Sequence, residues 1–228
     1  MTLLMALAVT ACATTSPDEA PAGASGPYQP GAPGEAGQSL SSQGPGALGL
    51  LPHTEDDVEF MRMMIVHHAQ ALEMVALVPD RSARSDVQSL ARRIRASQAD
   101  EIALMSRWLE RRDEAAPHVE LSTGRVVQDT GDHAHHAHHD DHHGHEAMAG
   151  MLSPAQMDEL AAASGEEFDR LFLEFMIYHH EGAIQMVHDL FRSPAGGQDG
   201  EMFGFASHVE SDQRIEIDRM RSMLATGS

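Results

Sequence analysis

The sequence contains little cysteine, few aromatic residues and few basic residues, and each shortage narrows what the protein can be. A single cysteine, Cys12, in 228 residues excludes a disulfide within the chain and a metal site made of several thiolates. Aromatic residues make up only 4%, and the prominence of Leu, Ala, Met and Ile favours helices over sheets. The 35 acidic residues against 15 basic ones give a formal net charge of −20, which excludes nucleic acid as a partner and attracts cations. Histidine and methionine, by contrast, are unusually frequent, with 16 and 15 residues.

The N-terminus predicts export and lipid anchoring. A short apolar run, Leu3–Ala11, leads into the pattern Val-Thr-Ala-Cys of a bacterial lipobox. In such a site the signal peptide, here residues 1–11, is cut before Cys12, and the cysteine is acylated. The run is too short to span a bilayer, and no Lys or Arg precedes it, which is atypical. We expect a lipoprotein of the bacterial cell envelope, periplasmic or on the outer surface; the alternative is an apolar terminus with an incidental cysteine.

Residues 12–52 predict a disordered tether. They are mainly Pro, Gly, Ala and Ser, with too few apolar side chains to bury a core. A flexible chain of this length would hold the next domain roughly 30–35 Å from the membrane. The folded domain is expected over residues 53–226.

Four segments have apolar residues spaced alternately three and four apart, which predicts four long amphipathic helices. Thr54 is the expected N-cap of the first helix, and Pro79 is expected to end it. Ser153 and Pro154 predict a short extra helix that reaches about Ala163. The four long helices are expected at about 54–79, 85–113, 166–191 and 199–224.

These helices contain an internal repeat. The motif M-I-x-H-H-x-x-A-x-x-M occurs at residues 64–74 and again at residues 176–186. A second motif, Q-x-x-E-I-x-x-M, occurs at residues 98–105 and again at residues 213–220. The chain therefore reads as a duplicated helical hairpin.

The repeat predicts the domain organisation. Repeat one covers residues 53–113, a long His-rich connection covers 114–152, and repeat two covers 153–226. Because neither hairpin can bury its apolar face alone, we expect the two to close into an all-α four-helix bundle.

Polar side chains interrupt the apolar stripes at matching places in both repeats. Burying each of them without a partner costs roughly 1–3 kcal/mol, so they must hydrogen-bond one another or bind a ligand. The residues concerned are His67, Gln98, Glu101, His179, Gln213 and Glu216.

The helical repeat limits which of these groups can share one ion. Adjacent histidines diverge by about 100° around a helix, so only one of each pair points along a given line. Met74 lies about 10.5 Å further along the axis than His67, in another layer. Glu101 and Glu216 are expected to hold imidazole N–H groups and fix their tautomers. The predicted site joins Met64 and His67 or His68 to Met176 and His179 or His180.

Thioether and imidazole ligands without a carboxylate suit Cu(I), and Cu(II) where imidazoles dominate. Zinc would use the histidines but give the repeated methionines no role as ligands. Iron–carboxylate bundles need Glu-x-x-His pairs, which this sequence lacks. The prediction is an extracytoplasmic protein that sequesters or delivers copper, or confers copper tolerance. We expect no catalytic turnover, because the sequence shows no nucleophile–base pair, no phosphate loop and no cysteine ligand.

The connection between the repeats contains a histidine tract that we interpret as an auxiliary metal-collecting arm. Imidazoles in a flexible segment bind Cu(II), Ni(II) or Zn(II) exchangeably at neutral pH. The alternative is an unstructured low-complexity loop. Met148 and Met151 beside it either add soft donors or pack against the following helix. The tract comprises His133, His135, His136, His138, His139, His142, His143 and His145.

The doubled motifs, with Met148-x-Gly150-Met151 between them, resemble a ferritin-like bacterial family known as domain of unknown function three hundred and five. That family includes periplasmic copper-binding proteins of the CopM type. The resemblance covers about residues 53–224 and implies a ferritin-like four-helix bundle, an exported location and copper binding or tolerance. The lipobox and the histidine tract depart from the family pattern and leave the preferred ion open. The ligands that the resemblance implies are Met64, His67, His68, Met74, Met176, His179, His180 and Met186.

Two other interpretations stay open from the sequence. Methionine at helical spacing is common core filling, and a buried His–Glu pair can be structural, so the domain would then be an interaction module without a metal. The other alternative is a metal-dependent redox enzyme on a ferritin-like bundle, which needs open coordination positions beside a substrate cavity.

Overall fold

The computed structural model describes residues 28–29, 38–39, 52–127 and 148–226. Residues 1–50 and 51–228 form two compact units. In the first unit, β1 (Tyr28–Gln29) pairs antiparallel with β2 (Gln38–Ser39). This short strand pair lies in the segment that was predicted to be a disordered tether. Strands of two residues carry no periodic pattern that the sequence could reveal. Cys12, the rest of the tether and the histidine tract lie outside the described residues.

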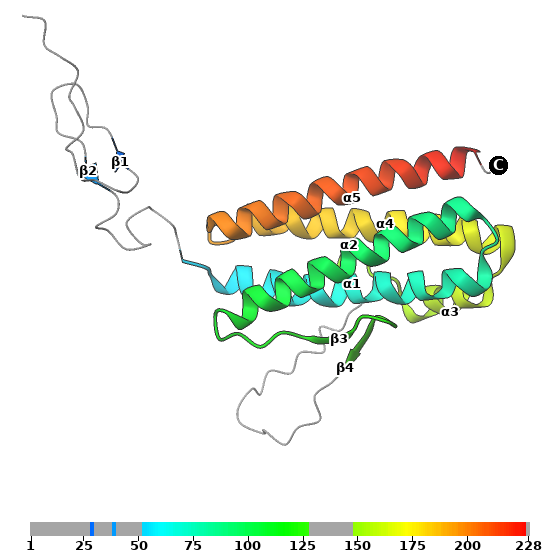
Figure 1. Cartoon of the computed structure of the whole chain (residues 1–228), viewed down its shortest axis with the longest axis horizontal. Coiled ribbons are helices and arrows are strands. Elements are labelled where there is room, and N and C mark those ends of the chain that lie inside the picture. The colour runs from blue at the N-terminus through cyan, green and yellow to red at the C-terminus, as the bar shows by residue number, and fades with distance from the viewer. Residues whose placement is uncertain (1–27, 30–37, 40–51, 128–147, 227–228) are drawn as a thin grey trace, which may run out of the picture. The chain divides into compact units, whose positions relative to one another are not determined.

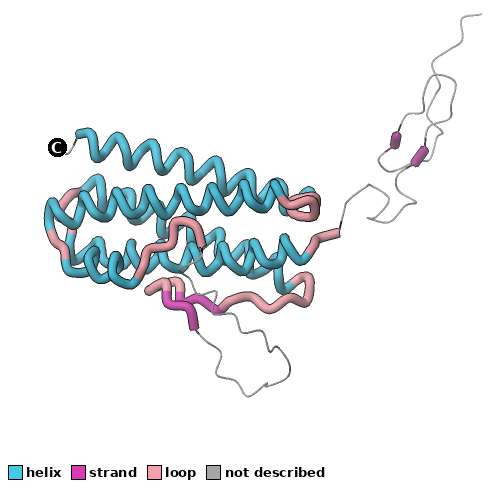
Figure 2. Tube along the Cα trace, turned by 180° about the vertical axis from the view of Figure 1, so that it is seen from behind, coloured by secondary structure: helices cyan, strands magenta, loops and turns pink. Residues whose placement is uncertain are grey.

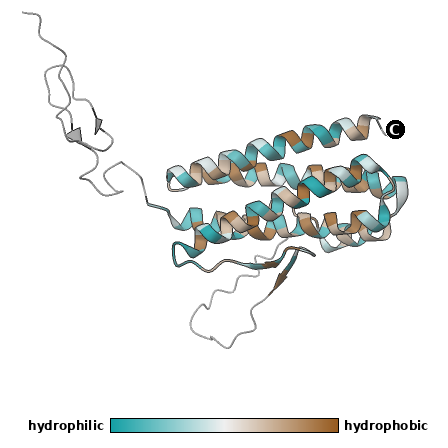
Figure 3. Ribbon diagram, in the orientation of Figure 1, coloured by the Kyte–Doolittle hydropathy of each residue, from teal (hydrophilic) through white to brown (hydrophobic). Residues whose placement is uncertain are grey.

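The second unit confirms the predicted all-α class, with one small strand hairpin added. A short helix, α3 (Pro154–Ala162), precedes the second pair of long helices. Figure 3 shows hydrophobic and hydrophilic residues interspersed along each helix, as expected of amphipathic helices. No helix in the described part of the chain is both long and apolar enough to cross a membrane. The four long helices are α1 (Glu55–Arg81), α2 (Ser85–Glu110), α4 (Gly165–Arg192) and α5 (Gly200–Thr226).

The two predicted N-caps are confirmed, and each forms a reciprocal capping box. The Thr54 hydroxyl accepts the Asp57 N–H at 3.3 Å, and the Asp57 carboxylate accepts the Thr54 N–H at 2.9 Å. Ser153 and Gln156 cap α3 in the same way, with Pro154 at the first helical position. These local bonds satisfy N–H groups that the helices themselves leave free.

Two predicted helix ends are wrong. Pro79 does not end α1, because its missing N–H removes only one bond toward the preceding turn. The following N–H of Ser82 still donates to the Val78 carbonyl at 3.0 Å, so the helix continues to Arg81. Helix α2 ends at Glu110, earlier than predicted, and Asp113 beyond it takes a left-handed φ of 59°.

The connection between the repeats contains a strand hairpin where no regular structure was predicted. β3 (His118–Glu120) pairs antiparallel with β4 (Arg125–Val127), and both lie beside α1 (Figures 1 and 2). Gly124 in their turn has a φ of +79°, and a Cβ there would lie 2.5 Å from the backbone nitrogen of Glu73. The strands are too short to show a period, and close packing on α1 holds them in place.

The long helices form two hairpins that meet through α1 and α4 (Figure 1). Helix α1 packs against α2, α4 packs against α5, and α1 packs against α4. Helices α1 and α4 run in opposite directions, since Gly197 after α4 donates its N–H to the Asp57 carboxylate at the start of α1, at 2.7 Å. At the other end, Arg84 before α2 contacts the Met223 carbonyl near the end of α5 at 3.4 Å. The two hairpins are therefore antiparallel, with the turn between α1 and α2 at the same end as the last residues of α5.

A layer of polar side chains, all buried except the half-buried Glu216, divides the hydrophobic core into two clusters. The first cluster joins the end of α1 and the start of α2 to the start of α4 and the end of α5, and includes Val78 and Phe172. The second cluster joins the opposite ends of these helices and includes Trp108 and Val187. Residues from all four long helices occupy the level between them. We call this set the polar layer: His67, His68, Gln98, Glu101, His179, His180, Gln213 and Glu216.

After the connection between the repeats, the chain packs against α1 and α4 through residues 148–152, which we call the strap. The strap lies at the level of the polar layer. The Gln70 side chain of α1 donates to the Leu152 carbonyl at 2.9 Å and accepts the Leu152 N–H at 2.8 Å. On α4, Gly182 lets the strap approach, because a Cβ there would overlap the Ala149 carbonyl. Gly150 has a φ of +77°, and a Cβ on it would lie 2.6 Å from the Gly182 Cα. Two glycines therefore allow backbone to lie directly on α4.

We expect Gly182→Ala to destabilise the protein by about 1–3 kcal/mol, because the added methyl group forces the strap away from α4. Gly204→Ala is the matched control, since it is also a helical glycine but a Cβ there meets nothing within 4 Å. The control should be neutral or stabilise by about 0.5–1 kcal/mol. Urea unfolding measures both, and equal shifts for the two variants would contradict close packing of the strap.

Candidate metal centre

Four histidines from two antiparallel helices meet inside the polar layer. His67 and His68 lie on α1, and His179 and His180 lie on α4. The rings of His67 and His179 face each other, with centroids 3.8 Å apart and planes inclined by 37°. The ring centroids of each adjacent pair are 6.4 Å apart on α1 and 6.3 Å apart on α4. All four side chains are buried, so their nitrogens have no access to bulk water.

Two outer carboxylates and one carbonyl hold three of the four imidazoles. His68 Nε2 lies 2.6 Å from Glu101 Oε2, and His180 Nε2 lies 2.7 Å from Glu216 Oε2. An ionised carboxylate can only accept, so each Nε2–H is the donor. His67 Nε2–H donates to the Ala149 carbonyl of the strap at 3.0 Å. These bonds fix the proton on Nε2 and leave the lone pair on Nδ1.

The lone pairs that remain have no partner within the protein. The Nδ1 atoms of His67, His68 and His180 are buried without a hydrogen bond. His179 has no partner at either ring nitrogen. Leaving a buried polar atom unsatisfied costs about 1–3 kcal/mol, and here five such atoms lie on four neighbouring rings. A bound cation would use the lone pairs that protein contacts do not, so these residues fit a metal.

Burial also keeps the two central imidazoles neutral. Desolvation lowers the pKa of His67 to about 3, and electrostatic repulsion from the nearby His68 lowers it further, while the bond to Ala149 acts in the opposite direction. Burial lowers the pKa of His179 well below its ordinary value, and the imidazoles of His67 and His180 lower it further, while the backbone of His67 acts in the opposite direction. Neutral imidazole is the form that binds metals, so both rings are ready to act as ligands at pH 7.

The candidate methionines lie on both sides of the histidines. Met64 of α1 and Met186 of α4 belong to the second cluster, whereas Met74 and Met176 belong to the first. All four are buried. Met64 and Met176, which the predicted site combines, therefore approach the polar layer from opposite sides, each one turn from the histidines of its own helix.

Other predicted residues lie around this centre. Gln98 and Gln213 are buried in the polar layer, and each has an unpartnered side-chain oxygen. Met148 is half-buried against the second cluster. Met151 lines a surface pocket together with Gln70. Among the described residues, no three histidines bring one ring nitrogen each to within 4.8 Å of the others.

Sequence reasoning missed three contributors that depend on tertiary contacts. Ala149 acts through its backbone carbonyl, so its side chain gives no signal. His208 and Asp212 of α5 lie close to Glu101 of α2, although nothing in the repeated motifs marks them. Comparing the two repeats position by position would have found them, because the first repeat has Arg93 where the second has His208.

The family model for a domain of unknown function (DUF305) matches residues 57–224, most of the chain. The chain belongs to the DUF305 family. The resemblance based on the doubled motifs is thereby confirmed, and the match spans both helical hairpins and the strap. None of the curated proteins matches the chain.

Solved structures of the DUF305 family share this fold. A DUF305 fragment from Deinococcus radiodurans is 29% identical with a TM-score of 0.60, covering 77% of this chain and 99% of its own. A DUF305 protein from Streptomyces coelicolor is 26% identical with a TM-score of 0.58, covering 75% and 93%. CopM in its Cu(I)-bound form is 23% identical with a TM-score of 0.50, covering 75% and 96%, and at this identity the likeness concerns the fold alone.

The lowered pKa values predict acid sensitivity of the metal-free protein. The unfolded chain binds protons on these histidines near the ordinary pKa of 6.5, whereas folded His67 binds one only near pH 3. Stability should therefore fall as the pH falls from about 6.5 toward 3, by about 1.4 kcal/mol per pH unit for each such histidine. Urea unfolding across this range measures the slope. His67→Gln/His179→Gln should show a smaller slope, and an unchanged slope would contradict the neutral, buried state of the rings.

Proposed function

We propose that the polar layer binds Cu(I), and that the protein sequesters or delivers copper. The observation that supports this most directly is the set of five buried imidazole nitrogens without a hydrogen-bond partner. A purely structural role would pair these atoms within the protein, as the Nε2 atoms of His68 and His180 are paired. His179, with neither nitrogen partnered, is the hardest of the four to explain without a ligand.

The donor types favour copper over zinc. Soft thioethers and imidazoles select Cu(I), and buried methionines flank the histidines on both sides. Zinc would use the imidazoles but would leave the four buried methionines without a role as ligands. CopM, which shares the fold, has been solved in a Cu(I)-bound form. In this chain, Met64, Met176 and the four histidines are the ligands that we propose, with Met74 and Met186 further along the same helices.

The proposal includes the architecture and the location. We propose that the two hairpins make a ferritin-like four-helix bundle, with the His-rich connection of residues 133–145 as a weaker collecting arm for Cu(II), Ni(II) or Zn(II). We further propose export, which the similarity to a secreted DUF305 protein from Streptomyces coelicolor supports, and acylation at Cys12, for which the lipobox pattern is the argument. Mass spectrometry of the mature protein from bacterial membranes tests this: an acylated N-terminal Cys12 is expected, and an intact residue 1 would contradict it.

We propose binding without catalytic turnover. The four histidines are buried, so a substrate would have no direct access to an ion held between them. If the protein were instead a metal-dependent redox enzyme, its copper-loaded form would oxidise a reductant catalytically. Oxygen uptake by the copper-loaded protein distinguishes binding alone from redox catalysis. Turnover above that of free copper would overturn the proposal of binding alone.

Copper titration of three full-length forms tests the centre. The forms are the wild type, a deletion of residues 133–145, and His67→Ala/His179→Ala, each titrated against a chromophoric Cu(I) chelator without oxygen. We expect the deletion to keep tight Cu(I) binding and the double variant to lose it. Cu(I) at 100 times its dissociation constant should stabilise the first two forms by about 2.7 kcal/mol, measured as a higher melting temperature. Loss of all Cu(I) binding in the deletion alone would refute the proposed centre.

The thioethers are tested separately from the imidazoles. Met64→Leu and Met176→Leu keep the side-chain volume and remove only the sulfur, so we expect little change in stability and at least a tenfold weaker Cu(I) affinity, about 1.4 kcal/mol. Met202→Leu is the matched control, because Met202 is also fully buried but lies outside the motifs. Equal affinities for all three variants would show that the methionines only fill the core.

A further inference from the structure

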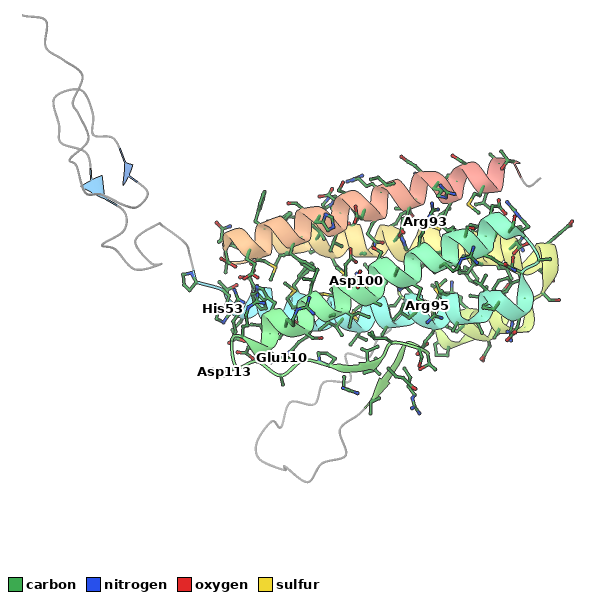
Figure 4. All side chains as sticks on the ribbon, in the orientation of Figure 1. His53, Arg93, Arg95, Asp100, Glu110 and Asp113 are labelled. Atoms are coloured by element: carbon green, nitrogen blue, oxygen red, sulfur yellow. The ribbon has the colours of Figure 1, made fainter. Side chains whose placement is uncertain are left out.

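A second group of metal-binding side chains lies between α2 and α5. Ligand atoms of Glu101, His208 and Asp212 all lie within 4.8 Å of one another. His208 and Asp212 are one turn apart on α5, with His208 Nε2 3.2 Å from Asp212 Oδ2. Glu101 comes from α2, next to Asp100, which Figure 4 labels. Two helices therefore bring one imidazole and two carboxylates together.

This group reaches from solvent to the interior. The side chains of His208 and Asp212 are 64% and 36% exposed, whereas that of Glu101 is 5% exposed. Oε2 of Glu101 binds His68 of the polar layer at 2.6 Å. Oε1 of Glu101 is buried and has no hydrogen-bond partner. A buried carboxylate oxygen without a donor is costly, and a cation at this position would satisfy it.

The internal repeat provides a built-in comparison. Glu216 occupies in the second repeat the place of Glu101 in the first, and it holds His180 as Glu101 holds His68. The residues that correspond to His208 and Asp212 in the first repeat are Arg93 and Ser97. The first repeat thus places the fixed positive charge of Arg93 at this position. The second repeat places two possible metal ligands there, and one of them, Asp212, adds a negative charge.

We propose that Glu101, His208 and Asp212 form a second site, which binds a divalent cation such as Zn(II). One imidazole nitrogen and two carboxylate oxygens are ligands that Zn(II) uses, and three protein ligands leave a position for water. One imidazole and two carboxylates are harder ligands than the imidazoles and thioethers of the centre that we propose for Cu(I), and this difference separates the two sites. The second site goes beyond the proposed function and does not depend on it.

Zinc titration by calorimetry tests the site. The full-length chain is used with the eight histidines of residues 133–145 replaced by Asn, so that the tract does not compete. We expect this protein to bind one equivalent of Zn(II) that His208→Ala/Asp212→Asn in the same background loses or binds at least about tenfold more weakly. Both substituted residues are exposed or half-exposed, so the fold should persist, and circular dichroism checks that it does. Unchanged zinc stoichiometry and affinity would overturn the proposal.

Two controls make the result specific. Arg93→Ala/Ser97→Ala changes the corresponding positions of the other repeat and should leave zinc binding unchanged; an equal loss there would overturn the assignment. The Cu(I) affinity of His208→Ala/Asp212→Asn should stay within about twofold of the parent, since no imidazole of the polar layer is altered. A parallel loss of Cu(I) would place these residues in the copper centre and overturn a separate zinc site.

Discussion

Four imidazoles buried at one level between antiparallel helices are the constraint on which this structure depends. Removing so many polar atoms from water is unfavourable unless each finds a partner. Glu101 and Glu216 approach from the outer helices and take one nitrogen each, and the strap supplies a backbone carbonyl to His67. The remaining nitrogens have no hydrogen-bond partner, and the rings of His67 and His179 lie with their centroids 3.8 Å apart. The same burial that costs stability keeps the central rings neutral and able to bind a cation.

The duplicated sequence does not make a symmetric site. Gln70 and Gly182 occupy the same position of the repeated motif, yet Gln70 binds the strap with its amide and Gly182 makes room for it. The strap therefore fits one way across α1 and α4, and it gives a hydrogen bond to His67 but none to His179. His179 is left as the least satisfied ring, although its sequence context is nearly the same as that of His67.

The distribution of donor atoms follows burial. Sulfur and neutral imidazole lie inside, where desolvation favours uncharged ligands, and carboxylates with one exposed imidazole lie toward solvent. Glu101 connects the two environments because one of its oxygens holds His68 and the other is unpartnered. An acidic surface with a formal net charge of −20 would raise the local concentration of cations around both.

The sequence by itself determined the helices, their duplication and the family, because hydrophobic period, capping residues such as Thr54 and repeated motifs are local and can be counted. It also determined that polar residues interrupt the apolar stripes. From the sequence, Glu101 was expected to hold an imidazole, but only the tertiary structure decided that this imidazole is His68. The tertiary structure also decided that the Ala149 carbonyl meets His67 and that α5 brings His208 to α2. These contacts join residues more than 30 positions apart, so they depend on how whole helices are rotated and how closely they pack. A backbone carbonyl, or a glycine that makes room for one, leaves no ligand pattern in the sequence.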